Sequence, residues 1–363
     1  MPRMVGRMIQ AFLRRTLHRE LVPTGQTDSL RGLHAEVERL EKEVASARTR
    51  NSNYRRRLKQ TRRRLRDREE RLRSLRLDLR DEHSAIDLRS ETADPVAAVY
   101  IAEDRPFVID VPLDRCRQFF SLGIRCSDAE LNPFVRSLVA YHDSRISNYA
   151  ESPLREFYSH CRPSCASDVL GVPGMDFPPL EAVLPWQRPD RQRIVEDRRT
   201  RIIWENDRDG LDASLSPGWQ NWGPVSRERG ERELARLVTV FESIRRAGYQ
   251  RRDGHRDGDI GGWILEEDDD WVCWIWAGGQ HRVAALAALG HTHAPIRVRG
   301  NMSGPDSPIR DRILRRDVDA WPHVRSGLFD RKSALAVFDR IMAGEPPPGL
   351  LPPSWRTGST RLR

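Results

Sequence analysis

The chain has 363 residues, 62 Lys and Arg against 53 Asp and Glu, and a formal net charge of +9 at pH 7. Hydrophobic residues make up 38% and charged residues 32%, which favours a globular part joined to a strongly polar segment. No apolar run is long enough to cross a membrane, and residues 1–21 lack the apolar core of a signal peptide. The sequence therefore predicts no transmembrane segment and a cytoplasmic protein, with attachment to a membrane surface or nucleoid left open.

Residues 1–25 are predicted to form an amphipathic helix, because its apolar side chains recur on one helical face. The apolar set is Met4, Val5, Met8, Ile9, Phe12, Leu13 and Leu17. Packing of this helix on its own protein is favoured over a position in a membrane interface.

A basic coiled coil is predicted over residues 28–84, since positions alternating by four and three residues form an unbroken heptad seam. These positions are Leu33, Val37, Leu40, Val44, Ala47, Asn51, Tyr54, Leu58, Thr61, Leu65, Arg68, Leu72, Leu75 and Leu79. We expect a homo-oligomer, a dimer, through residues 33–79. Like charges flank the seam in a parallel pair, so an antiparallel pair or an anionic partner is favoured.

The positive charge is concentrated in Arg48–Arg80, which contains fifteen basic and four acidic residues and so has a net charge of +11. The rest of the chain therefore has a net charge of −2. Such a segment is suited to a polyanion: a nucleic acid, an anionic membrane or a glycan. Its single aromatic residue, Tyr54, argues against base stacking. A solvated helix face explains the arginines equally well.

Residues 95–220 are predicted to form an accessory region that is helical or irregular. It begins with a strand near 106–113 and helical stretches near 114–142, and it becomes rich in Pro, Arg and Asp from 152 to 212. The five cysteines follow no framework spacing, so we expect free thiols. The HCRPSC stretch at 160–165 has poor spacing for zinc, and we expect no metal site.

Residues 221–343 are better organised and predict a small mixed α/β (α+β) sheet with helices. A helix over 231–249 precedes strands at 261–265 and 271–277, which are joined by an acidic turn at 266–270 expected to be solvated. A glycine turn, a short helix ended by Gly290 and a strand at 294–300 follow. Residues 344–363 read as a Pro-rich, basic tail.

The glycine turn lies where a strand gives way to a helix, and the first amides of such a helix attract anions. Gly278 and Gly279 would let a phosphate approach the backbone, with Gln280 at the helix start. Arg282 would grip phosphate oxygens with two donors, and His281 would donate or relay a proton. A tight turn whose His and Arg cap nearby carbonyls is the simpler alternative.

The stretch GGQHRVAALAALGHTHAPIRV (278–298) resembles the signature of the ParB/sulfiredoxin superfamily. The stretch ELARLVTVFESIRRAGY (233–249) is similar to the helix that precedes this signature in ParB amino-terminal domains. The resemblance covers residues 223–300. It implies ATP or CTP with Mg²⁺, held by Gly278, Gly279, Gln280, His281 and Arg282.

Two departures narrow what this resemblance implies. Gln280 stands where sulfiredoxins place their catalytic Cys, so reduction of sulfinic acids is not expected. No helix-turn-helix reader follows among residues 301–363. Kinases that resemble this fold keep an acid before the first helix, where Glu228 and Glu231 stand here. This comparison makes Glu231 the candidate base, with His281 as a second catalytic candidate. A glutamate that only interacts with the dipole at the helix start is the simpler alternative.

Three functions remain open. The first is a nucleotide-binding protein, with phosphoryl transfer to a small metabolite or carbohydrate as its candidate reaction. The second is a DNA-associated or RNA-associated protein that uses the domain as a nucleotide switch or nuclease. The third is a scaffold without enzymatic activity.

Overall fold

The computed structural model describes residues 36–40, 42, 45–46, 85–103, 105–211, 218–251, 258–275, 279–298 and 312–355. The chain divides into two compact units, Met1–Leu79 and Arg80–Arg363. In the first unit the described residues are helical, with Val37 and Leu40 each 47% exposed. The expected helix at 1–25, most of the heptad seam and the basic segment Arg48–Arg80 lie outside the described residues, so the coiled coil and its partners stay predictions.

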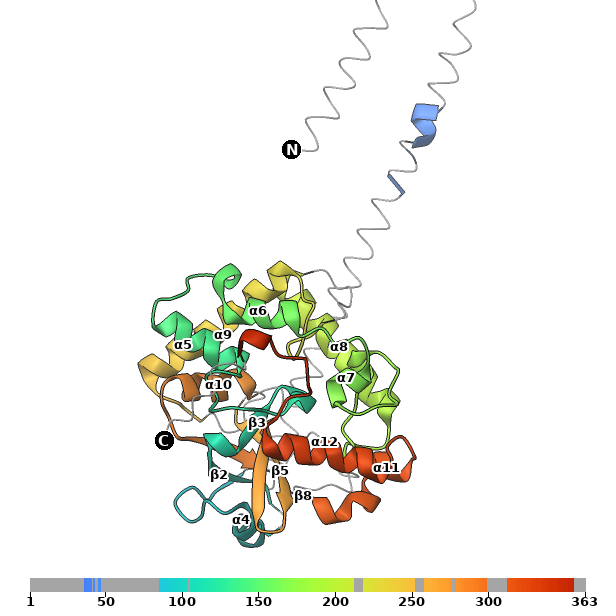
Figure 1. Cartoon of the computed structure of the whole chain (residues 1–363). Helices are drawn as coiled ribbons and strands as arrows, with labels where there is room; N and C mark the ends of the chain where they lie inside the picture. The colour runs from blue at the N-terminus through green and yellow to red at the C-terminus, as the bar shows by residue number, and fades with distance from the viewer. Residues whose placement is uncertain are drawn as a thin grey trace, which may run out of the picture. The chain divides into compact units, whose positions relative to one another are not determined.

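The second unit is a mixed sheet covered by helices (Figure 1). Its strands are β1 (Ile86–Asp87), β2 (Phe107–Pro112), β3 (Cys116–Gln118), β4 (Ile124–Arg125), β5 (Ile260–Glu267), β6 (Asp270–Ile275), β7 (His293–Val298) and β8 (Arg312–Leu314). The α-helices are α4 (Pro95–Ala102), α5 (Pro133–His142), α6 (Pro153–His160), α7 (Ala166–Leu170), α8 (Arg191–Asp209), α9 (Arg227–Ala247), α10 (Gln280–Ala288), α11 (Pro322–Arg325) and α12 (Arg331–Ala343).

The strands lie in the order β1-β2-β7-β5-β6-β3-β4, and β8 pairs with β5. The pairs β1–β2, β7–β5, β5–β8 and β3–β6 are parallel, whereas β2–β7, β5–β6 and β3–β4 are antiparallel. The expected mixed α/β sheet is therefore confirmed. It draws strands from both sides of residue 221, so the expected accessory region and the expected α/β domain share one sheet.

The predicted strand at 106–113 is confirmed as β2, and the predicted hairpin as β5 and β6. The expectation of helices from residue 114 is wrong as far as residue 125, where β3 and β4 lie. The acidic turn is also shorter than expected, because Glu266 belongs to β5. Its side chain is 8% exposed and holds the guanidinium of Arg312 in β8 with both carboxylate oxygens.

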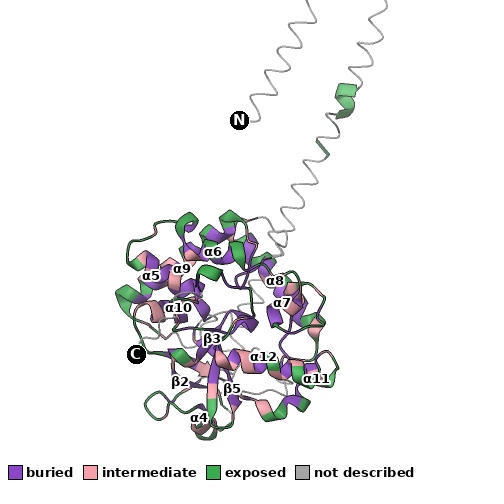
Figure 2. Cartoon of the chain, viewed as in Figure 1, coloured by how far each residue is buried: buried purple, intermediate pink, exposed green. Residues whose placement is uncertain are grey.

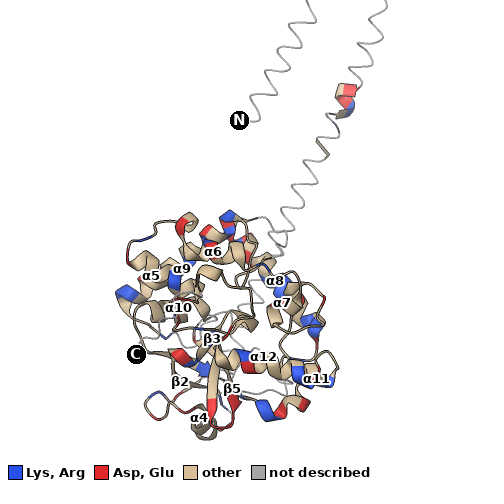
Figure 3. Cartoon of the chain, viewed as in Figure 1, with Lys and Arg blue, Asp and Glu red and all other residues tan. Residues whose placement is uncertain are grey.

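The sheet carries a continuous apolar core, and buried residues concentrate on its strands and on the inner sides of the helices (Figure 2). On α9 the buried side chains include Leu234, Leu237, Phe241 and Ile244. Acidic and basic residues are interspersed along the outer surfaces of the helices (Figure 3). Four of the five cysteines are buried, among them Cys116 and Cys273, which are partners on β3 and β6.

Helices cover both faces of the sheet near β3 and β6. Arg117 on β3 donates 3.0 and 2.8 Å hydrogen bonds to the carbonyl oxygens of Ile341 and Met342, which places α12 on one face. Side chains alternate between the faces of a strand, so Gln118 and Ile275 point to the other face. That face is covered by α10, which packs in turn on α5 and α9.

Candidate functional site

The glycine turn after β6 is shaped first by packing. Gly278 lies outside the described residues, whereas Gly279 precedes α10 directly. A Cβ atom on Gly279 would lie 2.6 Å from Cγ2 of Ile260 and 3.1 Å from Cγ2 of Ile275. Only a glycine lets α10 begin this close to β5 and β6, so contact with the sheet alone accounts for this residue.

The amino terminus of α10 has no side-chain cap. Every other helix of eight or more residues that the structure describes begins with a capping side chain, namely Asp94, Asn132, Ser152, Asp190, Ser226 and Asp330. Among the described residues no side chain caps the first amides of α10, and the helix dipole favours an anion there.

Arg282 secures the chain in front of β5. Its two terminal nitrogens donate to the carbonyl oxygens of Gly258 and Asp259 at 2.9 and 3.0 Å. The carboxylate of Asp259 accepts a 2.8 Å bond from Nε of Arg251 and lies 3.9 Å from Arg297. Three guanidinium groups thus surround the entrance to β5 around one buried carboxylate.

A second ion pair, Arg89 with Asp87, lies beside these guanidinium groups. Asp87 lies 3.6 Å from Arg251 and is held by Arg89 through both oxygens, at 2.8 and 2.7 Å. The hydrogen bonds from Arg89 lower the pKa of Asp87 despite its partial burial. The whole arginine cluster comprises Arg89, Arg251, Arg282 and Arg297 together with Asp87 and Asp259, near the start of α10.

His281 is bound by an acid from α9. Its Nε2 lies 2.8 Å from Oε1 of Glu233, and its ring lies 5.0 Å from that of Phe134 on α5. Glu233 is 3% exposed. Burial alone would raise its pKa, but His281, Arg229 and Arg208 outweigh burial and lower it. The structure thus places a buried carboxylate directly against the imidazole.

Glu231, the acid singled out from the sequence, is placed differently. Its carboxylate accepts a 2.8 Å bond from Arg227 one turn earlier, and its side chain is 48% exposed. Glu233 was not identified from the sequence as a candidate site residue. Its position in the sequence was a signal, because it falls among the buried positions of α9, next to Leu234. A carboxylate at such a position needs a partner inside the protein.

Glu233 also belongs to a network of buried ion pairs between α8 and α9. Its second oxygen lies 3.4 Å from Arg236, which also pairs with Asp209 on α8. One turn earlier, the buried Arg229 lies 3.2 Å from Glu205 of α8. This network fixes α9 and so the position of Glu233.

Unpartnered polar atoms surround the ends of β3 and β6. Both amide atoms of Gln118, which is 0% exposed, lack a hydrogen-bond partner. The same holds for Oε1 of Gln280 at the start of α10, which is 4% exposed. Because β3 and β6 are parallel, Gln118 and the start of α10 lie at the same edge and on the same face of the sheet.

The turn Trp219–Trp222 lies at this same end of β3. Trp219 and Trp222 exchange backbone hydrogen bonds of 2.8 and 3.1 Å, and the Trp222 ring lies 6.3 Å from that of Phe120, just beyond β3. Four buried atoms of the turn have no partner: Nε1 of Trp219, Nε2 of Gln220, Oδ1 of Asn221 and Nε1 of Trp222. No local sequence pattern marks this set, because its residues come from three separate segments.

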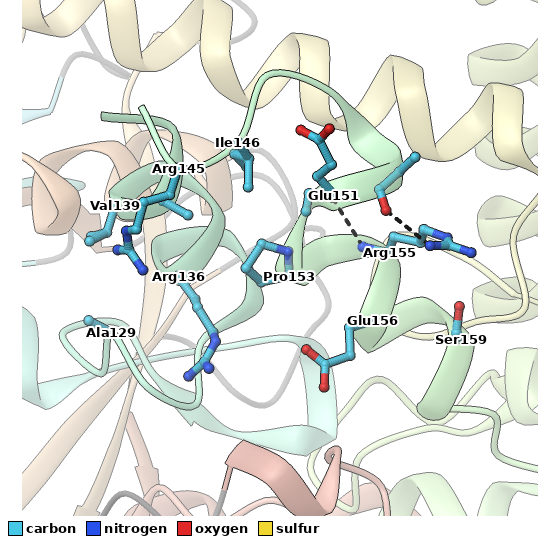
Figure 4. A pocket seen from close by; sticks show the side chains of 13 residues that line it. Ala129, Arg136, Val139, Arg145, Ile146, Glu151, Pro153, Arg155, Glu156 and Ser159 are labelled. Atoms are coloured by element: carbon cyan, nitrogen blue, oxygen red, sulfur yellow. Dashed lines mark hydrogen bonds between the residues drawn. The ribbon is translucent and has the colours of Figure 1, made fainter. Parts of the chain in front are cut away.

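A separate cavity of about 640 Å³ opens between α5 and α6 (Figure 4). Its lining includes Arg136 and Arg145, whose side chains extend from the α5 side, and Glu156 on α6. Glu156 accepts 2.8 Å bonds from Ser354 and from the indole of Trp355. Arg136 is placed over the Trp355 ring, so the cavity wall is built together with the last described residues.

Comparison with family models, with curated proteins and with solved structures found no match for this chain. The part of the chain that the structure describes contains no helix able to cross a membrane. Nor do three or more His, Cys, Asp or Glu side chains gather there as metal ligands would.

Proposed function

We propose that the second unit binds the phosphate groups of a nucleotide, ATP or CTP, at the amino terminus of α10. The single observation that carries this proposal is the uncapped start of α10 beside the arginine cluster. Helix amides without a side-chain cap and a neighbouring group of guanidinium charges together suit a polyphosphate. Mg²⁺ would arrive with the nucleotide, since it is commonly held by substrate phosphates and one or two carboxylates.

Phosphoryl transfer to a small hydroxylated metabolite is the reaction class we propose. Such a reaction needs a group that takes the proton of the acceptor. The His281–Glu233 pair supports this role better than Glu231, because the buried carboxylate fixes the imidazole at the helix start. Glu231 instead pairs with Arg227 on the surface of α9.

Nucleotide binding is tested by calorimetric titration of the full chain with inorganic triphosphate, ATP and CTP in the presence of Mg²⁺. Arg282→Lys keeps the charge but loses the paired hydrogen bonds to the carbonyl oxygens of Gly258 and Asp259, which hold the arginine cluster in place, so we expect about tenfold weaker binding. The matched control is Arg340→Lys, because Arg340 also donates to backbone carbonyls, those of Leu170 and Glu345, in another part of the fold.

The control should lose thermal stability as Arg282→Lys does and keep its affinity for triphosphate. No heat of binding with any of the three ligands would refute the proposal and leave the scaffold function. The DNA-associated or RNA-associated alternative rests on Arg48–Arg80, and its test is retention on duplex DNA that falls steeply with salt.

A further inference from the structure

We infer that the polar atoms around the ends of β3 and β6 recognise the base of the nucleotide, a planar heterocycle. This inference rests on the proposed function and adds to it the part of the ligand that is selected. The atoms belong to Gln118 on β3, to Gln280 on α10 and to the turn Trp219–Trp222.

Unpartnered atoms of this kind are unusual in a protein interior, where polar groups nearly always have partners. Several other buried polar side chains of this core do have partners. The buried amide of Asn132 donates to the carbonyl oxygen of Arg125 and accepts from two backbone amides of α5. The hydroxyls of Ser121 and Ser137, both 0% exposed, donate to carbonyl oxygens at 2.6 and 2.7 Å. Seven unpartnered atoms gather around the ends of β3 and β6, where a ligand would supply the missing partners, whereas others, among them Nε1 of Trp186 and Nε2 of His323, lie elsewhere in the core.

The chemistry of this set selects the class of ligand. It offers uncharged donors, the two indoles and two amide nitrogens, together with the amide oxygens of Gln118, Asn221 and Gln280. Aromatic rings stand among these groups: Trp219 and Trp222 lie 6.3 Å apart at 84°, and Phe120 and Trp274 lie beyond. Neutral donors and acceptors between aromatic rings suit a flat base, which presents its edge to amides and its face to a ring.

A buried guanidinium beside the turn Trp219–Trp222 already has backbone partners. Arg198 lies over the rings of Phe120 and Trp219, and its Nη1 donates to the carbonyl oxygens of Leu180 and Ala182. This guanidinium is therefore engaged with the backbone, whereas the arginine cluster serves the phosphates. Gln280 joins the two parts of the site, because it stands at the start of α10 and carries one of the unpartnered oxygens.

Binding of the base requires movement of the turn Trp219–Trp222. Its side chains are between 0% and 8% exposed, so a base reaches them only after the turn lifts from the end of β3. Tyr158 holds the turn through a 3.0 Å bond to the carbonyl oxygen of Gln220. The unpartnered groups raise the free energy of the ligand-free state, in which the turn lies on the end of β3. Hydrogen bonds to the base offset the free-energy cost of lifting the turn.

The test compares the four nucleoside triphosphates and inorganic triphosphate on the full chain and on Gln118→Met and Asn221→Leu. The wild type should prefer one base by about tenfold or more. Both substitutions should erase this preference and leave the affinity for inorganic triphosphate unchanged. They should also raise the melting temperature of the ligand-free protein by about 2 °C or more, because Gln118→Met removes two unpartnered buried atoms and Asn221→Leu removes an unpartnered buried oxygen.

Asn132→Leu is the matched control. It also replaces a buried amide by an apolar side chain, but this amide has three partners. It should lower the melting temperature and keep the preference for one base.

Equal binding of all four nucleotides by the wild type would overturn the inference, as would binding of neutral sugars in place of nucleosides. A lower melting temperature for Gln118→Met with base preference intact would do the same, and this variant decides if Asn221→Leu does not fold. Base-selective binding of nucleosides without any binding of inorganic triphosphate would instead refute the phosphate site and leave the base site standing.

Discussion

His323 on α11 illustrates how a single buried side chain can couple stability to pH. It is 1% exposed, and burial, aided by Arg191, lowers its pKa to about 4 from the usual 6.5. The unfolded chain takes up a proton below pH 6.5, whereas the folded protein takes it up only near pH 4. The contribution to stability is therefore complete above pH 6.5 and is lost as the pH falls through 4.

We expect the free energy of unfolding to fall by about 1–3 kcal/mol between pH 7 and pH 4 on account of this residue. Denaturant titration at pH 7, 5.5 and 4 measures the fall, and His323→Phe should make it smaller. An unchanged pH dependence in this variant would show that other groups, chiefly carboxylates, cause the whole effect.

A substitution at Gly279 distinguishes the two explanations of the glycine turn, close packing against the sheet and close approach of a ligand. Gly279→Ala places a methyl group 2.6 Å from Ile260, so we expect a loss of about 1–3 kcal/mol even without a ligand. Thermal unfolding measures this loss. Gly290→Ala is a useful comparison with φ +80° and no atom within 4 Å, where backbone strain and not crowding acts. An unaffected Gly279→Ala protein would leave ligand approach as the reason for this glycine.

Residues of the candidate site were only partly readable from the sequence. The order Gly279–Gln280–His281–Arg282 predicted a helix start with polar groups, and the structure places it so. The partners of these residues were not readable, because Glu233 and the carbonyls that Arg282 binds come from segments brought together only by the fold. Residues that are adjacent in the sequence can be recognised as a polar helix start, whereas their hydrogen-bond partners depend on tertiary packing.

Elements were predictable in proportion to their length. The helix α9 has 21 residues, enough to repeat its apolar spacing several times, and the hairpin strands have eight and six residues with clear β-branched and aromatic content. The strands β3 and β4 have three and two residues, too few for any alternation to show. They form because parallel pairing with β6 and packing of α12 hold them.

The sheet makes the two halves of the second unit depend on each other for folding. Strands β1 to β4 precede residue 221 and strands β5 to β8 follow it, so neither half contains the complete sheet. We expect a fragment of residues 80–363 to unfold cooperatively at the melting temperature of the full chain, whereas residues 221–355 alone should show no cooperative transition. Circular dichroism melts of the two fragments measure this difference.

The same fragments test the predicted coiled coil. Full chain that elutes as a dimer, beside a monomeric fragment of residues 80–363, would assign self-association to residues 1–79. A dimeric fragment would place the contact in the second unit instead. Cooperative melting of residues 221–355 would contradict the view that the two halves depend on one sheet.

The buried cysteines give this sheet a built-in chemical reporter. Cys116, Cys126 and Cys273 are each 0% exposed around β3 and β6, and burial raises the pKa of the Cys126 and Cys273 thiols well above the ordinary value. An alkylating reagent therefore modifies them only during excursions that part these strands, while the more accessible Cys165 supplies an internal reference. The ratio of the two labelling rates would follow how often the centre of the molecule opens, without any engineered probe.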